Sequence, residues 1–371
     1  MEQKELIKIT AIVNRAYTNK LVDELFEHNI CTVFIEAGRT SMLQEKKKFF
    51  SLSNKKAMIS DPGDIISFFV LPENEKKIIA LIDHILDLSM PGKGSVFSSD
   101  AWMVNAFSDI FSNVNFIYNI DDSFTAYSEL SGISCIVQRG SGDDISHLIL
   151  DSGVSVPVST YGTGTGVRDK LGLLRITIPA EKEIITLIMS KYDADAVMEL
   201  IIAEGKLSQP GKGFIYDFPV RHGFVNTKIS IGTSGQVATL EQIISAIDTL
   251  KGGIEWRKSK VDQESSSKLR FLENLTELNL ICNEGYGFDL MKVALDNGAS
   301  GATISKLKFK GRGEEASKIS PSHEICRMIV GTQNIVTIAH ALAEASAFDE
   351  KVHGLLFSQD VYKAFTYLGP S

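Results

Sequence analysis

One pattern of apolar runs, helical periods and turns occurs three times in this chain of 371 residues, and its spacing constrains the fold. The end of the first apolar run and the start of the second are always 17 residues apart: Val13 to Ile30, Val137 to Val154 and Cys282 to Ala299. The third run and the final glycine are always 24 residues apart: Val70 to Gly94, Met189 to Gly213 and Val330 to Gly354. Equal spacings without gaps indicate internal repeats, which decide the fold before any single motif does.

The order of elements within each copy is β-α-β-β-α-β, which is typical of a split βαβ, or ferredoxin-like, unit. The sequence therefore predicts an α+β protein of three ferredoxin-like modules. The predicted parts are a first repeat at 1–104, an apolar connector at 105–131, a second repeat at 132–222, a connector at 223–274 and a third repeat at 275–371. In the second connector, a capping box that begins at Thr239 and a stop at Gly252 predict a helix over 239–251.

The loop that closes each repeat has a composition suited to binding phosphate. Pro91-Gly92-Lys93-Gly94 and Pro210-Gly211-Lys212-Gly213 are near copies, and His353-Gly354 is a reduced third version. Proline donates no backbone hydrogen bond and glycine tolerates positive φ, so these loops expose their amides. Exposed amides and a lysine can cradle a phosphate group. A plain turn between helix and strand is the alternative, and the recurrence of the motif favours binding.

These motifs, in this order, resemble the PII (GlnB-like) signalling proteins, which are small trimeric ferredoxin-like modules. Gly162-Thr163-Gly164-Thr165 resembles the glycine-rich start of the family's T-loop, and Gln209 to Tyr216 resembles its B-loop and the strand that follows. Asn297 to Thr303 in the third repeat resembles the family's glycine-rich entry to strand two, and the first repeat has Gly38-Arg39-Thr40 as well as its Pro-Gly-Lys-Gly loop. The three modules together cover about two-thirds of the chain.

The resemblance implies an intramolecular pseudo-trimer with three unequal clefts that bind ATP or ADP, or another small anionic effector. It also implies a regulated protein partner that contacts the 44–60 loop. The implied ligand-binding residues are Gly38, Arg39, Gly92, Lys93, Gly94, Gly162, Gly164, Thr165, Gly211, Lys212, Gly213, Arg221 and Thr303. The chain also departs from the family. The arginines that the family carries past its fourth strand have no clear counterpart, since only Arg221, His222 and Lys228 stand nearby. The tyrosine-bearing stretch of the T-loop is absent, and the third loop lacks Pro-Gly-Lys.

Composition narrows the remaining classes of function. The net charge of −8 argues against binding nucleic acid, and no apolar stretch reaches the ~20 residues that would insert into a membrane. Four scattered cysteines and histidines without ligand spacing predict no metal site and a cytoplasmic protein. No catalytic motif is found, so we expect a regulator and not an enzyme, working as one chain or as a dimer. A slow nucleotide hydrolase, an unrelated enzyme and a structural adaptor with degenerate clefts stay open.

Overall fold

The computed structural model of the chain describes residues 4–45, 56–88, 90, 92–106, 118, 124–166, 181–226, 230–231, 269–313 and 319–368. The predicted helix at 239–251 and the tip of the predicted 44–60 loop lie outside these residues. Three segments of the chain are used below: the first is 4–106, the second 130–224 and the third 275–366.

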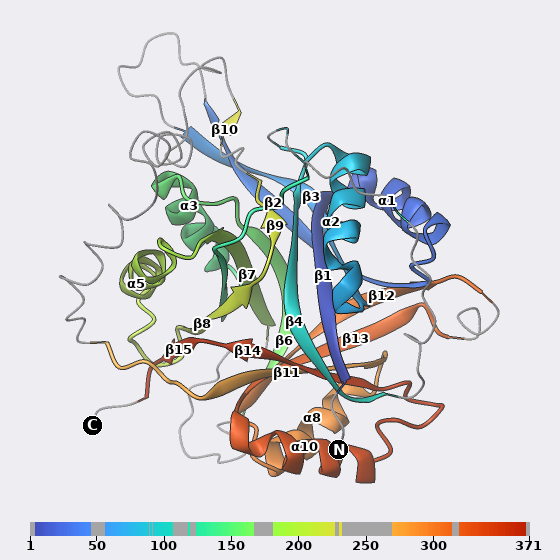
Figure 1. Cartoon of the computed structure of the whole chain (residues 1–371). Helices are drawn as coiled ribbons and strands as arrows, with labels where there is room; N and C mark the ends of the chain where they lie inside the picture. The colour runs from blue at the N-terminus through green and yellow to red at the C-terminus, as the bar shows by residue number, and fades with distance from the viewer. Residues whose placement is uncertain are drawn as a thin grey trace.

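Each segment contributes a similar series of elements (Figure 1). The first contains β1 (Lys4–Asn14), α1 (Arg15–Glu27), β2 (Thr32–Glu45), β3 (Lys56–Val70), α2 (Glu75–Leu86) and β4 (Ser95–Ala106). The second contains β5 (Leu130–Gln138), α3 (Gly142–Ser152), β6 (Val158–Gly166), β7 (Glu181–Ser190), α5 (Ala194–Glu204), β8 (Gly213–Val220) and β9 (Gly223–Phe224), and β10 (Ser230–Ile231) follows it. The third contains β11 (Leu275–Asn283), α8 (Gly287–Asp296), β12 (Gly301–Gly311), β13 (Ser322–Gly331), α10 (Ile335–Glu344), β14 (Leu355–Val361) and β15 (Lys363–Thr366). Short 3₁₀ turns at Pro72–Asn74 and Thr332–Asn334 precede α2 and α10.

All of these strands belong to one 15-stranded sheet. Its hydrogen-bonded order is β10-β2-β3-β1-β4-β14-β11-β13-β12-β6-β7-β5-β8-β15, with β9 bonded to β4. Strand β2 also pairs with β12 and with β6, so the path through the first and third segments returns to its start and the sheet closes on itself. Apart from the two-residue pairing of β10 with β2, the pairings are antiparallel.

This closed antiparallel sheet contradicts the predicted fold class of three ferredoxin-like α+β modules arranged as a pseudo-trimer. Within a segment the strands follow the order second, third, first, fourth, but the segments are not separate units. The fourth strand β4 bonds to β14 of the third segment, and β2 bonds to strands of both other segments. An unpaired strand edge exposes a row of N–H and C=O groups, and here these edges pair with one another. The spacing of elements within a repeat depends on contacts between neighbouring elements, and it does not indicate which strand edges of different repeats pair.

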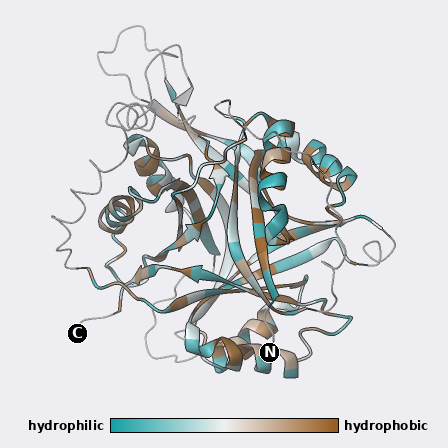
Figure 2. Ribbon diagram, viewed as in Figure 1, coloured by the Kyte–Doolittle hydropathy of each residue, from teal (hydrophilic) through white to brown (hydrophobic). Residues whose placement is uncertain are grey.

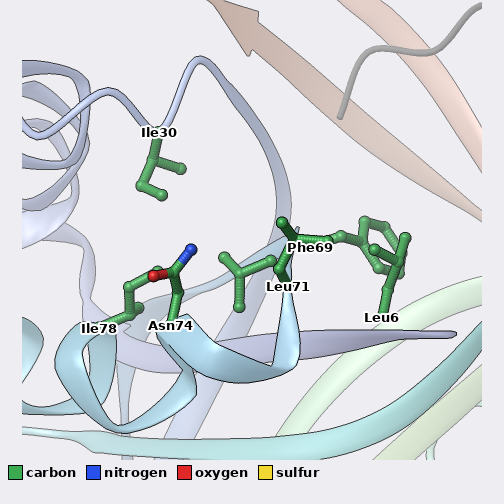
Figure 3. A pocket seen from close by; sticks show the side chains of 7 residues that line it. Leu6, Ile30, Phe69, Leu71, Asn74 and Ile78 are labelled. Carbon is green, nitrogen blue, oxygen red and sulfur yellow. The ribbon is translucent and has the colours of Figure 1, made fainter. Parts of the chain in front are cut away.

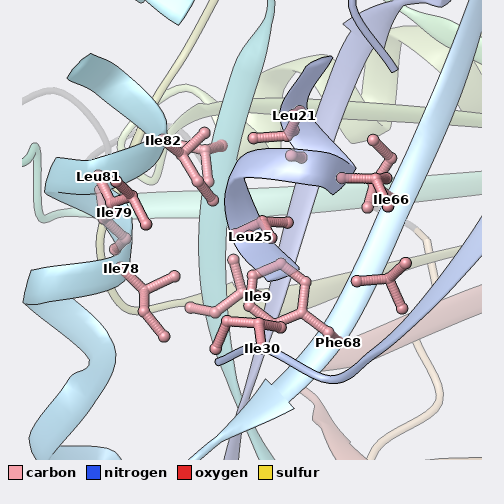
Figure 4. Packing of buried hydrophobic residues seen from close by; sticks show 14 of the residues in the cluster. Ile9, Leu21, Leu25, Ile30, Ile66, Phe68, Ile78, Ile79, Leu81 and Ile82 are labelled. Atoms are coloured by element: carbon pink, nitrogen blue, oxygen red, sulfur yellow. The ribbon is translucent and has the colours of Figure 1, made fainter. Parts of the chain in front are cut away.

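The helices cover the outer side of the sheet, and each pair of helices encloses its own apolar core (Figure 1). In the first segment, Ile9 and Phe68 from the sheet meet Leu25 of α1 and Ile78 of α2 (Figure 4). All four side chains are fully buried, and burial of each contributes about 2 kcal/mol relative to leaving it exposed. The helices show mixed hydrophobic and hydrophilic positions in Figure 2, as amphipathic helices do.

The inner side of the sheet has apolar contacts at the boundaries between segments. Phe34 and Phe69 of the first segment pack with Phe357 of the third, and Phe69 and Phe357 have ring centroids 4.8 Å apart. Ile12 of the first segment packs with Val158 of the second, and a smaller group joins the second segment to the third. Because these residues alternate along the strands with the helix-facing ones, the segments share a continuous interior. No helix among the described residues is long and apolar enough to cross a membrane.

Candidate functional site

The two Pro-Gly-Lys-Gly loops have the same backbone geometry. Each begins at a left-handed residue after its helix, Asp87 with φ 57° and Lys206 with φ 55°. The N–H groups three residues later, of Met90 and Gln209, donate to these residues' carbonyls over 3.0 Å. The lysine N–H then closes a second turn, at 3.4 Å in the first loop and 3.3 Å in the second. The repeated sequence therefore builds one turn twice, between α2 and β4 and between α5 and β8.

The third loop begins in the same way and then diverges. Ser346 has φ 59°, the Asp349 N–H donates to its carbonyl over 3.2 Å, and the Val352 N–H donates to Asp349 over 3.0 Å. Val352 thus occupies the position that a lysine holds in the other loops, and it is buried. His353 is one extra residue before Gly354 and itself has φ 50°.

In the first loop, protein groups already occupy the amide and the lysine. The N–H of Gly92 donates to Oδ1 of Asn226 over 3.0 Å, and the N–H of Asn226 donates to the Ser95 hydroxyl over 2.9 Å. The ammonium of Lys93 lies over the ring of Tyr17, 5.6 Å from its centre. The side chain of Asn226, which comes from the chain past β9, therefore sits where an anionic oxygen would accept the amide hydrogen.

In the second loop, protein groups bind the carbonyls. Nε2 of Gln138, at the end of β5, donates to the Gly211 carbonyl over 3.0 Å. The hydroxyl of Thr366, in β15, donates to the Gly213 carbonyl over 3.0 Å. Gly211 has φ 72° and Lys212 is exposed. In the part of the chain that the structure describes, no acceptor bonds to the Gly211 N–H and no carboxylate pairs with Lys212. Two side chains thus bind the carbonyls of this loop, while its Gly211 amide and exposed Lys212 have no partner among the described residues.

The glycines predicted to begin the T-loops lie within strands. Gly38 lies on β2 opposite Thr160 of β6, and Gly164 lies on β6 opposite Thr303 of β12. A Cβ atom at Gly38 would come within 2.9 Å of the Ser159 carbonyl oxygen, so glycine lets these strands approach closely. Gly162 and Thr165 lie on the same strand β6, and the Thr165 hydroxyl is buried with no partner among the described residues. The structure thus brings Gly38, Gly164 and Thr303 to one seam between the segments, on strands and apart from the lysine loops.

Arg39 is bound by acidic groups of the second segment. Its guanidinium contacts Asp143 and lies 3.4 Å from Glu183, and the ring of Tyr161 lies 5.7 Å away. The carboxylate of Glu183 also accepts the N–H groups of Gly140 at 3.2 Å and Gly142 at 2.6 Å, at the start of α3. The negative charge of this carboxylate interacts favourably with the positive end of the helix dipole. Arg39 therefore fixes β2 to the N-terminus of α3.

Equivalent acidic residues recur in the other segments. Asp64, Glu183 and Glu324 each lie opposite the last buried residue of their segment's first strand, at Val13, Val137 and Cys282. Asp64 accepts from Thr18 of α1, and Glu324 accepts the N–H of Gly287 at the start of α8. The 17-residue spacing of the sequence corresponds to this anchoring of the first helix in each segment.

Arg221 has a structural role. Its guanidinium contacts Glu75 at 3.2 Å and Asp100 at 2.7 Å, which joins the end of β8 to the first segment. Burial opposes ionisation of Glu75, but hydrogen bonds from Ser98, His222 and Arg221 lower the pKa of this carboxyl below its ordinary value. The Arg221 guanidinium is therefore paired with the carboxylates of Glu75 and Asp100, and no hydrogen bond or ion pair among the described residues joins it to either loop.

Two hollows in the described part of the chain lie away from the second loop. The first is lined by Leu6, Phe69 and Asn74 and holds about 10 Å³, room for one water at most (Figure 3). The second has a volume of about 300 Å³ and lies between α8 and the third loop, bordered by Tyr286 and Lys351. The described residues include no group of three or more histidine, cysteine, aspartate or glutamate side chains placed to hold a metal ion.

Three residues that support the loops were not predicted from the sequence. Gln138 had a signal, because an amide residue ends the first strand in every segment, as Asn14, Gln138 and Asn283. Nδ2 of Asn283 donates to the Lys351 carbonyl over 2.9 Å, which is the counterpart of the bond from Gln138. Asn226 and Thr366 had no signal, since each comes from a chain return whose partner strand the sequence does not specify.

The sequence matches no protein-family model and no curated protein. Solved structures that match part of the chain include two of one protein. The structure of B. subtilis GlnK is 16% identical with a TM-score of 0.22, covering 26% of this chain and 85% of GlnK. The structure of the B. subtilis GlnK-ATP complex is 17% identical with a TM-score of 0.23, covering 26% of this chain and 84% of that one. Each of these two matches leaves about three-quarters of this chain unaligned.

Proposed function

We propose that this chain is a PII-like regulatory protein that binds the phosphate groups of an adenine nucleotide, ATP or ADP, at the loop 206–213. The observation that carries the proposal is the difference between two loops that share the same two turn hydrogen bonds. The first has its Gly92 amide bound by Asn226 and its lysine over an aromatic ring. The second presents the Gly211 amide and the exposed Lys212 without an acceptor among the described residues. The resemblance of this loop to a B-loop supports a phosphate ligand.

The chemistry of the second loop suits an anion. Gly211 has the left-handed φ of 72°, and adjacent backbone amides in turns with such a residue can form a concave site for phosphate oxygens. Lys212 adds a full positive charge on a flexible stem. Because Gln138 and Thr366 bind the loop's carbonyls from behind, the loop has its shape before a ligand arrives, which reduces the entropy lost on binding.

The arm formed by β2 and β3 supports a regulatory output. It leads to the predicted partner-contacting loop at 44–60, and its base is attached to the second segment. The N–H of Ser41 donates to the Pro157 carbonyl over 3.2 Å, and Leu43 packs against Leu150 of α3. Arg39 on the same strand binds Asp143 and Glu183. A ligand that shifts the second segment would therefore bias the position of the arm and its contact with a regulated protein.

Equilibrium binding of ATP and ADP to the purified chain tests the proposal, with thermal unfolding as a second readout. A nucleotide at a hundred times its dissociation constant should stabilise the fold by about 2.7 kcal/mol. We expect Lys212→Ala to weaken binding at least tenfold, and Lys93→Ala, its matched control in the first loop, to leave binding within twofold. Equal losses in the two variants, or no binding by wild type, would refute the assignment. Steady product release from bound ATP would instead identify a hydrolase.

A further inference from the structure

One hollow of the third segment plays no part in the proposed function. It has a volume of about 300 Å³ and lies between α8 and the loop that follows α10. Sites for small molecules have volumes of ~300–1,000 Å³, so the hollow is large enough for one small organic molecule. Its walls combine apolar, aromatic and charged side chains, and these decide which kind of molecule fits.

One stripe of α8 forms a wall of the hollow. Tyr286, Asp289, Leu290 and Val293 all line it, and their spacing along the helix places their side chains on one face. Leu290 and Val293 are apolar, and Val352 of the loop opposite adds a third apolar side chain. The hydrocarbon part of a ligand would contact these three side chains.

The charged groups that line the hollow have a net negative charge. The carboxylates of Asp289, on α8, and Asp349, on the loop, line it together with the ammonium of Lys351. All three side chains belong to exposed residues, and none of them forms an ion pair with another described residue. Two negative charges and one positive charge favour a cation as the ligand.

The first segment has the same aromatic residue, and there the chain supplies the cations itself. Tyr17 and Tyr286 each stand four residues after the last buried residue of their segment's first strand. The ammonium of Lys93 lies over the Tyr17 ring, 5.6 Å from its centre. The ammonium of Lys20, on α1, donates to the Ile85 carbonyl near the end of α2 over 3.0 Å. Two lysines thus occupy the space between helix and loop in the first segment.

The third segment has neither lysine at the equivalent positions. Val352 stands at the position of Lys93, because its N–H closes the second turn of the loop. Asp289 stands at the position of Lys20, because each follows its tyrosine by three residues. The Tyr286 side chain is 40% exposed, and no cation of the described residues lies over its ring. The third segment therefore keeps the aromatic ring, reverses a neighbouring charge and lacks the cation that covers the ring in the first.

We propose that this hollow binds a small organic cation, an ammonium group attached to a hydrocarbon body. The ammonium takes the place that Lys93 has in the first segment, because the face of the Tyr286 ring attracts a cation. The carboxylates of Asp289 and Asp349 accept its hydrogen bonds, which are strengthened by the opposite charges. The hydrocarbon body packs on the apolar side chains of the hollow and leaves water. This site is separate from the loop 206–213, so it does not depend on the proposed function.

Three probes with similar hydrocarbon bodies and different head groups test the proposal on the wild-type chain. Phenethylamine is the cation, phenethyl alcohol is its neutral counterpart of nearly the same shape, and phenylpropionate is the anion. In NMR titrations at low ionic strength the amine should bind at least about tenfold tighter than the alcohol, because the ring and the two carboxylates attract only the ammonium. The anion should bind no better than the alcohol. Equal binding of amine and alcohol overturns the proposal, and so does no binding of the amine at about 10 mM, which nearly fills a site of millimolar affinity.

Variants test whether the amine binds in this hollow. Asp289→Lys introduces the residue type of Lys20 and should weaken amine binding at least about tenfold, and Tyr286→Leu should weaken it about threefold. Tyr17→Leu is the matched control in the first segment, where Lys93 already covers the ring, and it should leave binding unchanged. Equal losses in the two tyrosine variants, or no loss in Asp289→Lys, would place the amine elsewhere and refute the assignment.

Asp349→Asn, on the loop, keeps the proposal testable if Asp289→Lys does not fold. Asp289 lies in the first turn of α8, where a negative charge also stabilises the helix, so the ratio of amine to alcohol binding is the quantity to compare. Asp349→Asn should lower this ratio about threefold, and an equal effect on both probes would contradict the proposal. None of these measurements involves nucleotide, so this site and the proposed nucleotide site can fail separately.

Discussion

Replacement of Lys8 by methionine should make the protein's stability respond differently to alkaline pH. Burial lowers the pKa of Lys8 to about 8 from an ordinary value of 10.5; Arg327 lowers it further, while Glu277 and Glu36 oppose the shift. Between these two values the unfolded chain holds a proton that the folded chain has lost. The contribution of Lys8 to the unfolding free energy therefore rises with pH across this window.

The size of the effect follows from the two pKa values. The full difference of 2.5 units, from 10.5 to about 8, corresponds to about 3 kcal/mol, and the part that falls between pH 8 and pH 10 is about 2 kcal/mol. We expect the unfolding free energy of wild type to gain this amount relative to Lys8→Met over that interval. The difference between the two proteins is the useful quantity, because the titrations of all other groups cancel in it.

Urea unfolding at several pH values from 7 to 10.5 measures this difference, with linear extrapolation to water. Lys212→Met, at an exposed loop position, controls for the removal of one positive charge. If the curves of wild type and Lys8→Met run parallel within about 0.5 kcal/mol from pH 8 to 10, the reasoning is wrong. Lys8 would then hold its proton in the folded protein, and its surroundings would be far better hydrated than its burial indicates.

Two further changes test the fold. His323 packs against Phe34 and Phe309, and its burial, together with His353, lowers the pKa of its ring from 6.5 to about 4, so the folded protein loses stability as the pH falls from 6.5 toward 4. His323→Phe should remove about 2 kcal/mol of the loss in unfolding free energy measured between pH 7.5 and 4.5, and an unchanged loss would contradict this. Gly94→Ala should cost at least about 3 kcal/mol, because φ is +130° and the new Cβ would lie 2.4 Å from the Ile12 carbonyl oxygen. Gly140→Ala, at φ +91° with open space around it, should cost about 1 kcal/mol in the same denaturation assay, and equal costs would argue against the close contact.

The sequence predicted local structure better than global structure. Spacing from Val13 to Ile30 and from Val70 to Gly94 describes one helix or one turn between adjacent strands, and such distances are fixed by local geometry. The pairing of β4 with β14 joins residues about 250 positions apart, and no periodicity encodes it. The prediction of separate modules was therefore wrong, although the order of elements along the chain was read correctly. Gly38 and Gly164 were interpreted as loop residues, because glycine is favoured both in flexible loops and where two strands approach closely.

The candidate site divides in the same way. The Pro-Gly-Lys-Gly motif specified both turns, so Lys93 and Lys212 stand on equivalent loops. What separates the loops is Asn226, which reaches the first from the far side of β9. That contact depends on where the chain returns after the second segment. Sequence reasoning treated the two lysines alike for this reason.

The chain returns after the second and third segments have a consequence for folding during synthesis. Strand β9 of the second segment pairs with part of the free edge of β4, and β15 of the third segment pairs with β8. Each of these two segments therefore covers a strand edge of the segment synthesised before it. The rest of that same edge of β4 pairs with β14, close to the C-terminal end of the described chain. A ribosome that has released only the first segment therefore leaves β4 bonded to β1 alone, and the end of β4 that pairs with β14 stays open until about 250 more residues follow. The nascent protein must hold an open strand edge for tens of seconds at ordinary rates of translation, a period in which chaperones have reason to bind it.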